Sequence, residues 1–161
     1  MGGHAGIWFS DDDAVLMSPA TYREFVVPYN SRILTTFGGG CIHYCGNATH
    51  QAENFLATEG LRAINTYTLY HLQAFRALKA KLQGRIVLFA CDFTALDYED
   101  YFRELLDGLA TDGLVILSQF TPRVALIKGG KYEPVSREVG AGKKQVSEFL
   151  QNYFRSRKPP S

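Results

Sequence analysis

Residues 69–91 read LYHLQAFRALKAKLQGRIVLFAC, and this stretch decides the fold class. Its first part, residues 69–82, carries apolar side chains at helical spacing, namely Leu72, Phe75, Leu78 and Leu82. Gly84 ends the predicted helix. Residues 85–91 then form a run that is apolar on both faces, which is typical of a strand in a parallel sheet.

The same alternation of strands and helices extends along the first 120 residues. We expect further strands in residues 5–9, 41–45, 63–68 and 114–120, and the clearest helix in residues 97–109. Ser18-Pro19 predicts a helix start, and Pro28 should kink or split that helix. About five parallel strands separated by helices predict an α/β fold. Residues 121–161 add a predicted hairpin over 124–135 and a terminal helix over 143–155.

Length and composition exclude several classes of protein. With 161 residues, 46% of them hydrophobic, the chain fits a single folded domain over residues 1–161. A net charge of +1 argues against a nucleic-acid surface, and no apolar run is long enough to span a membrane. The odd number of three cysteines and the lack of a signal peptide predict a reducing, cytoplasmic location.

The segment Cys41-Ile42-His43-Tyr44-Cys45 holds the strongest chemical signal. In a strand, alternate residues point to the same face, so both cysteines and His43 should share one side. Imidazole and thiolate are good zinc ligands, and a catalytic zinc takes about three ligands from the protein. His43 and Cys45 supply two; a core cysteine and a hydrogen-bonded histidine is the other interpretation. Cys41 lies deeper and is expected in the core.

A third ligand must come from elsewhere in the chain. Cys91 ends another predicted strand, and it is either that ligand or a small buried hydrophobic residue. The acidic residues Asp11, Asp12 and Asp13 follow the first strand. One of these carboxylates, and Asp92 after Cys91, could face the site as ligand, base or substrate contact; a solvated turn is the alternative.

Three segments resemble the uroporphyrinogen decarboxylase superfamily in order and spacing. The first runs from Asp12-Asp13 through Ser18-Pro19 to Pro28-Tyr29, the second is Ile42-His43-Tyr44-Cys45-Gly46-Asn47, and the third covers residues 85–92. The resemblance spans roughly residues 5–120 and implies the C-terminal half of a TIM (β/α)8 barrel. It implies that the chain is a fragment, or closes its barrel with another half such as a second copy, or covers the open sheet edge with its hairpin and final helix.

The resemblance implies two chemical branches. Cobamide-dependent methyltransferases bind zinc through His-x-Cys and a late cysteine; His43 and Cys45 match the pair, whereas Ser118-Gln119 occupies the late position. Either Cys91 replaces that cysteine or the zinc site is incomplete. The favoured function is zinc-dependent methyl transfer to a thiol from a methylated corrinoid on a partner protein. The alternatives are a decarboxylase acting on a tetrapyrrole and a truncated, non-catalytic half-barrel.

Overall fold

The computed structural model describes residues 6–68, 71–93, 98–119, 124–128, 131–135 and 139–156. The strands are β1 (Ile7–Ser10), β2 (Gly40–Tyr44), β3 (Leu61–Tyr67), β4 (Val87–Phe93), β5 (Leu114–Gln119), β6 (Val124–Lys128) and β7 (Lys131–Val135). The α-helices are α1 (Pro19–Phe25), α2 (Val27–Thr36), α3 (Ala52–Ala57), α4 (Leu72–Leu82), α5 (Tyr98–Leu106) and α6 (Val139–Ser156). Two short 3₁₀ helices are η1 (Asp12–Val15) and η2 (Thr49–Gln51).

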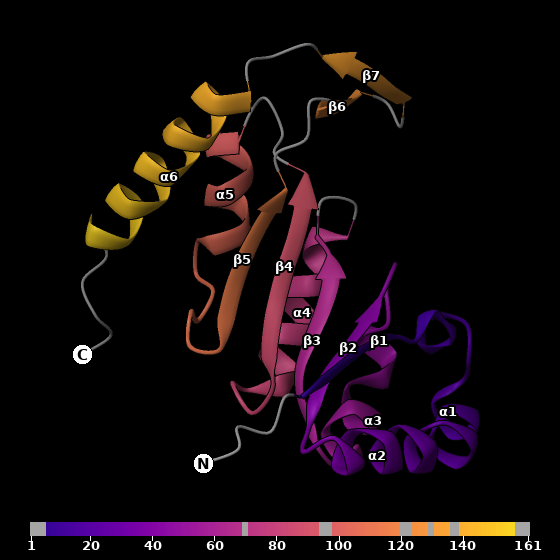
Figure 1. Ribbon diagram of the computed structural model, residues 1–161. Helices are drawn as coiled ribbons and strands as arrows, with labels where there is room; N and C mark the ends of the chain where they lie inside the picture. Colours follow the sequence, from indigo (N-terminus) through magenta and orange to yellow (C-terminus); the bar gives the residue numbers. More distant parts are fainter. Residues whose placement is uncertain are drawn as a thin grey trace. The chain divides into compact units, whose positions relative to one another are not determined.

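Five parallel strands form one sheet in the order β1-β2-β3-β4-β5, which confirms the predicted α/β fold (Figure 1). The order in space is the order along the chain, with no reversal. Crossovers between parallel strands are right-handed in nearly all proteins, so an unreversed order brings successive connecting helices to the same face. The strands β6 and β7 form a separate antiparallel pair, as the predicted hairpin requires.

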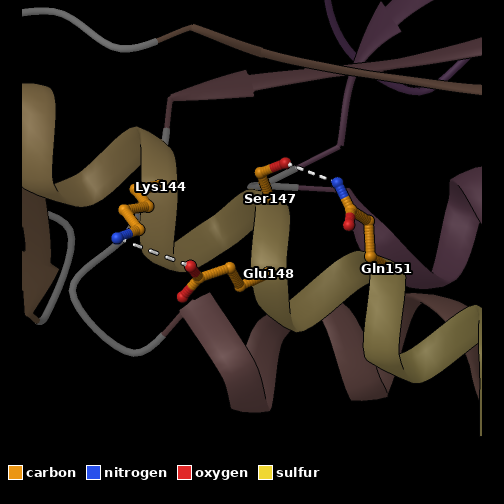
Figure 2. Close-up of polar contacts among 4 residues, drawn as sticks. All are labelled: Lys144, Ser147, Glu148 and Gln151. Carbon is orange, nitrogen blue, oxygen red and sulfur yellow. Dashed lines mark hydrogen bonds and ion pairs between the residues drawn. The ribbon is translucent and has the colours of Figure 1, made fainter.

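The chain divides into two compact units. The first holds β1–β3, most of β4 and of β5, and helices α1–α4; the second holds α5, β6, β7 and α6. Within the second unit, α5 and α6 pack through aromatic rings, with Phe102 stacked on Phe149 at 6.4 Å between ring centroids. Another side of α6 is polar, and Figure 2 shows its ion pair between Lys144 and Glu148, 3.8 Å apart.

Burial differs between the two faces of the sheet. On one face, Ile42 and Ile64 have no exposed surface, and Tyr44 stacks on Phe55 of α3 with 5.8 Å between ring centroids. The residues that alternate with these along each strand point to the opposite face of the sheet, where Trp8 of β1 is 61% exposed. Helices therefore bury one face, and the opposite face carries His43.

Pro28 divides the helical segment that follows β1, as expected from the sequence. The helix α1 starts at Pro19, with Ser18 as its N-cap accepting a hydrogen bond from the Thr21 N–H at 3.2 Å. It ends at Phe25, and Pro28 lies in the first turn of α2, where its missing N–H is not needed.

A buried carboxylate joins the end of β1 to these two helices. Asp11 is 9% exposed, and its Oδ2 accepts hydrogen bonds from Tyr22 Oη at 2.5 Å and from Asn30 Nδ2 at 2.7 Å. Burial and the hydrogen bond to Asp11 raise the pKa of the Tyr22 phenol, so the hydroxyl stays protonated as a donor. The Asp11 N–H donates to the carbonyl of His43 at 2.7 Å, so the same residue also fixes β1 against β2.

Replacement of Tyr22 by Phe should lower the free energy of unfolding by about 1–3 kcal/mol, because a buried carboxylate loses a donor. Urea denaturation measures this loss. Tyr29→Phe is the matched control, since Tyr29 is 56% exposed and should change stability by less than about 0.5 kcal/mol. Equal effects from the two variants would contradict the role assigned to the Asp11 hydrogen bonds.

Candidate metal centre

Three of the residues singled out in the sequence come together at the ends of β1 and β2. The potential ligand atoms of Asp12, His43 and Cys45 all lie within 4.8 Å of one another. His43 belongs to β2, Cys45 follows that strand directly, and Asp12 begins the 3₁₀ turn after β1. Because the strands are parallel and Ser10 pairs with His43, both carboxyl ends reach the same edge of the sheet. Active sites of barrel proteins lie at this edge.

The imidazole of His43 is held from both sides. Its Nδ1 lies 2.6 Å from Oδ1 of Asn65, and its Nε2 lies 3.2 Å from Sγ of Cys45. Asn65 is 2% exposed and sits beside His43 in the β2–β3 register. A carboxamide oxygen can only accept, so Nδ1 carries the proton and Nε2 presents its lone pair to the site. Metal-binding histidines are oriented by such an outer partner.

The carboxylate of Asp12 faces the end of β2. Its Oδ1 accepts a hydrogen bond from the Cys45 N–H at 2.7 Å, and its Oδ2 accepts one from Ser10 Oγ at 3.1 Å. Partial burial raises the pKa of the Cys45 thiol, and the negative charge of Asp12 raises it further. A bound divalent cation would reverse this effect, because it favours the thiolate and offsets the carboxylate charge.

Cys45, His43 and Asn65 also lie in the order found in cysteine hydrolases with a Cys-His-Asn triad. Such a nucleophile needs a lowered thiol pKa, usually from a neighbouring positive charge. The pKa of Cys45 is raised instead, and the neighbouring charge is the carboxylate of Asp12. The neighbour of Cys45 is therefore a carboxylate and not the positive charge that would activate such a nucleophile.

Asp11 and Asp13, the neighbours of Asp12, do not join the cluster. Asp13 is exposed in η1, while Asp11 is engaged by Tyr22 and Asn30. The side chain of Asp92 lies outside the part of the chain that the structure describes. Of the three adjacent aspartates, only Asp12 therefore faces His43 and Cys45.

Cys91, the expected third ligand, is buried in β4 and lies outside the group of clustered ligand atoms. The strand β3 separates β4 from β2, which puts about 9–10 Å between their backbones. Cys91 still makes a small contribution to the raised pKa of Cys45. Cys41, expected in the core, is only half-buried; burial raises the pKa of its thiol to about 11.

Asn65 was not singled out from the sequence, although one signal pointed to it. It is an amide side chain within the predicted strand of residues 63–68, and a polar side chain in a buried strand usually has a specific partner. Its partner could be named only after the register of β2 and β3 was known.

Comparisons with known proteins identify no relative of this chain. No family model matches it, and neither a curated protein nor a solved structure matches it. In the described part of the chain, no helix is long and apolar enough to cross a membrane. The function of the site is therefore inferred from its own geometry and from the motifs in the sequence.

The three thiols should react with iodoacetamide in a fixed order. In metal-free protein, Cys45 is exposed and should be modified first, whereas Cys91 is 2% exposed and should react only after unfolding. Cys41, with a pKa of about 11, should react slowly and accelerate about tenfold per pH unit between about pH 8 and 10, because its thiolate fraction grows. Mass spectrometry of digested protein measures each site.

Cys45→Ser serves as the control, and it should remove the fast modification without changing the other two. Modification of Cys91 before Cys45 in the native protein would contradict the placement of the two thiols.

Proposed function

We propose that Asp12, His43 and Cys45 bind zinc and that the chain is a zinc-dependent enzyme acting on a thiol. The observation that carries this proposal is the meeting of a carboxylate, an imidazole nitrogen and a thiol within 4.8 Å at the carboxyl end of β1 and β2. All three groups are zinc ligands, and three protein ligands leave one tetrahedral position open for substrate. An open position is what separates catalytic from structural zinc sites.

Each residue of the site would have its own role toward a bound zinc ion. Cys45 and His43 would provide a thiolate and an imidazole ligand, Asp12 would provide a negatively charged ligand, and Asn65 holds the ring of His43. When bound, zinc lowers the pKa of a substrate thiol and so supplies a thiolate nucleophile at neutral pH.

The motif resemblance extends this proposal to methyl transfer. The thiolate would attack the methyl group of a methylated corrinoid carried by a partner protein. A carbon–sulfur bond forms, and the cobalt–carbon bond breaks with its electron pair left on cobalt. The product is a methyl thioether.

The same proposal includes a barrel architecture for the sheet. Its unreversed strand order supports a (β/α)8 arrangement, since doubly wound sheets reverse their order at the ligand crevice. Apolar side chains on the two edge strands also support closure by further strands: Trp8 on β1 is 61% exposed and Leu117 on β5 is 40% exposed. A second copy or another half-barrel would supply those strands.

Zinc should bind with one ion per chain, and loss of a ligand should weaken it strongly. His43→Ala and Cys45→Ser should each raise the zinc dissociation constant by more than about 100-fold, since even an outer partner of a ligand is worth about 10–100-fold. Asp12→Ala should raise it by at least about tenfold. Isothermal titration calorimetry of metal-free protein measures these constants.

Matched controls exist for two of the ligand types. His71→Ala and Cys41→Ser remove a histidine and a cysteine outside the cluster and should leave zinc affinity unchanged. Equal zinc affinity in the wild-type protein and in the ligand variants would contradict the proposed zinc site.

Zinc-loaded protein should transfer the methyl group of methylcobalamin to 2-mercaptoethanol. The rate of thioether formation, followed by mass spectrometry, should fall at least about tenfold in metal-free protein and in Cys45→Ser. Cys41→Ser should keep the wild-type rate. A rate of thioether formation that does not depend on zinc would contradict the methyl-transfer proposal and leave the proposed zinc site unaffected.

A further inference from the structure

The side chain of Gln51 is fully buried and yet makes polar contacts with the segment that carries Asp12. Gln51 ends η2 and has no exposed surface. Its Nε2 donates to the carbonyl of Ala14 at 3.2 Å and to that of Met17 at 2.8 Å. Both carbonyls belong to the segment that follows Asp12.

The acceptor side of the same amide is also used. Oε1 of Gln51 accepts a hydrogen bond from Asn54 Nδ2 at 2.7 Å, and the same nitrogen donates to the carbonyl of Pro19 at 2.8 Å. Asn54 Oδ1 in turn accepts from Arg23 Nε at 3.0 Å. Gln51 and Asn54 thus connect η2 and α3 to the later part of the segment between β1 and α1, at Ala14 and Met17, and to α1 itself.

The 3₁₀ turn η1 is closed by backbone hydrogen bonds, such as that from the Leu16 N–H to the Asp13 carbonyl at 3.0 Å, and further contacts hold it against its neighbours. The turn has four residues, and no side chain caps its start. It is also held from the β2 side: Gly46 approaches Val15 so closely that a Cβ would lie 3.2 Å from Val15 Cγ1. His50 Nε2 adds a contact of 3.1 Å to the carbonyl of Met17.

We propose that Gln51 is a positioning residue that holds η1 so that the carboxylate of Asp12 reaches the metal centre. This inference rests on the proposed zinc site for its functional meaning. Burial of an amide is costly unless its hydrogen-bonding groups are paired, and both donated bonds of Gln51 go to the Asp12 segment. An apolar residue of similar volume would fill the space without directing the turn.

The first test needs no metal. The Cys45 N–H donates to Asp12 Oδ1, so its hydrogen exchange, followed by NMR, reports where Asp12 lies. Gln51→Met should lower the protection of this amide by at least about tenfold, as Asp12→Ala does.

Thr58→Val is the matched control. Thr58 is 5% exposed and donates to the Asn54 carbonyl at 2.8 Å, so its loss removes a buried hydrogen bond at the other end of α3. This variant should lower stability and leave the Cys45 amide protected. Unchanged protection in Gln51→Met, or equal loss in Thr58→Val, would overturn the inference.

The second test is a double-mutant cycle on the zinc dissociation constant. Gln51→Met should raise the constant at least about tenfold, and adding Asp12→Ala should then cost less than about twofold, because the ligand is already displaced. If the dissociation constant of the double variant rises by the product of the two separate factors, Gln51 acts independently of Asp12, and the inference is overturned. Failure of the wild-type protein to bind zinc would refute the proposed function, while the amide exchange would still decide whether Gln51 positions Asp12.

Discussion

The parallel pairing of β1 with β2 is the constraint on which the candidate site depends. Ser10 lies opposite His43, and the Asp11 N–H donates to the His43 carbonyl at 2.7 Å. This register makes the two strands end together, so the residues that follow them, Asp12 and Cys45, meet. A slip of one residue would turn His43 to the helix-covered face and separate the three groups.

Hydrophobic burial fixes that register, and the register determines to which face of the sheet the polar side chains point. Ile42 and Tyr44 belong to the buried face, so the residues between and beside them must point to the other face. The polar groups have conflicting preferences of their own: the carboxylate of Asp12 raises the pKa of the thiol beside it. A bound cation would relieve this conflict, because it favours the thiolate and offsets the charge of the carboxylate.

Much of the fold could be predicted from the sequence, and so could half of the site. Apolar periodicity predicted the alternation of strands and helices, and the His43-x-Cys45 spacing predicted that these two side chains lie together. The choice among three adjacent aspartates could not be predicted, because it depends on Tyr22 and Asn30 engaging the first of them. The distance from Cys91 was equally hidden: the sequence predicted one strand between Cys45 and Cys91, but it did not show that their side chains lie apart.

The sequence by itself determined the strand and helix types, the break at Pro28 and the face shared by His43 and Cys45. These features follow from neighbours a few residues apart, so local periodicity and backbone chemistry suffice. Only the tertiary structure decided that Asp12 joins the pair and that Asn65 and Gln51 support it. Those contacts join residues 22 to 37 positions apart, and they exist only once the register of the sheet and the packing of the loops are set.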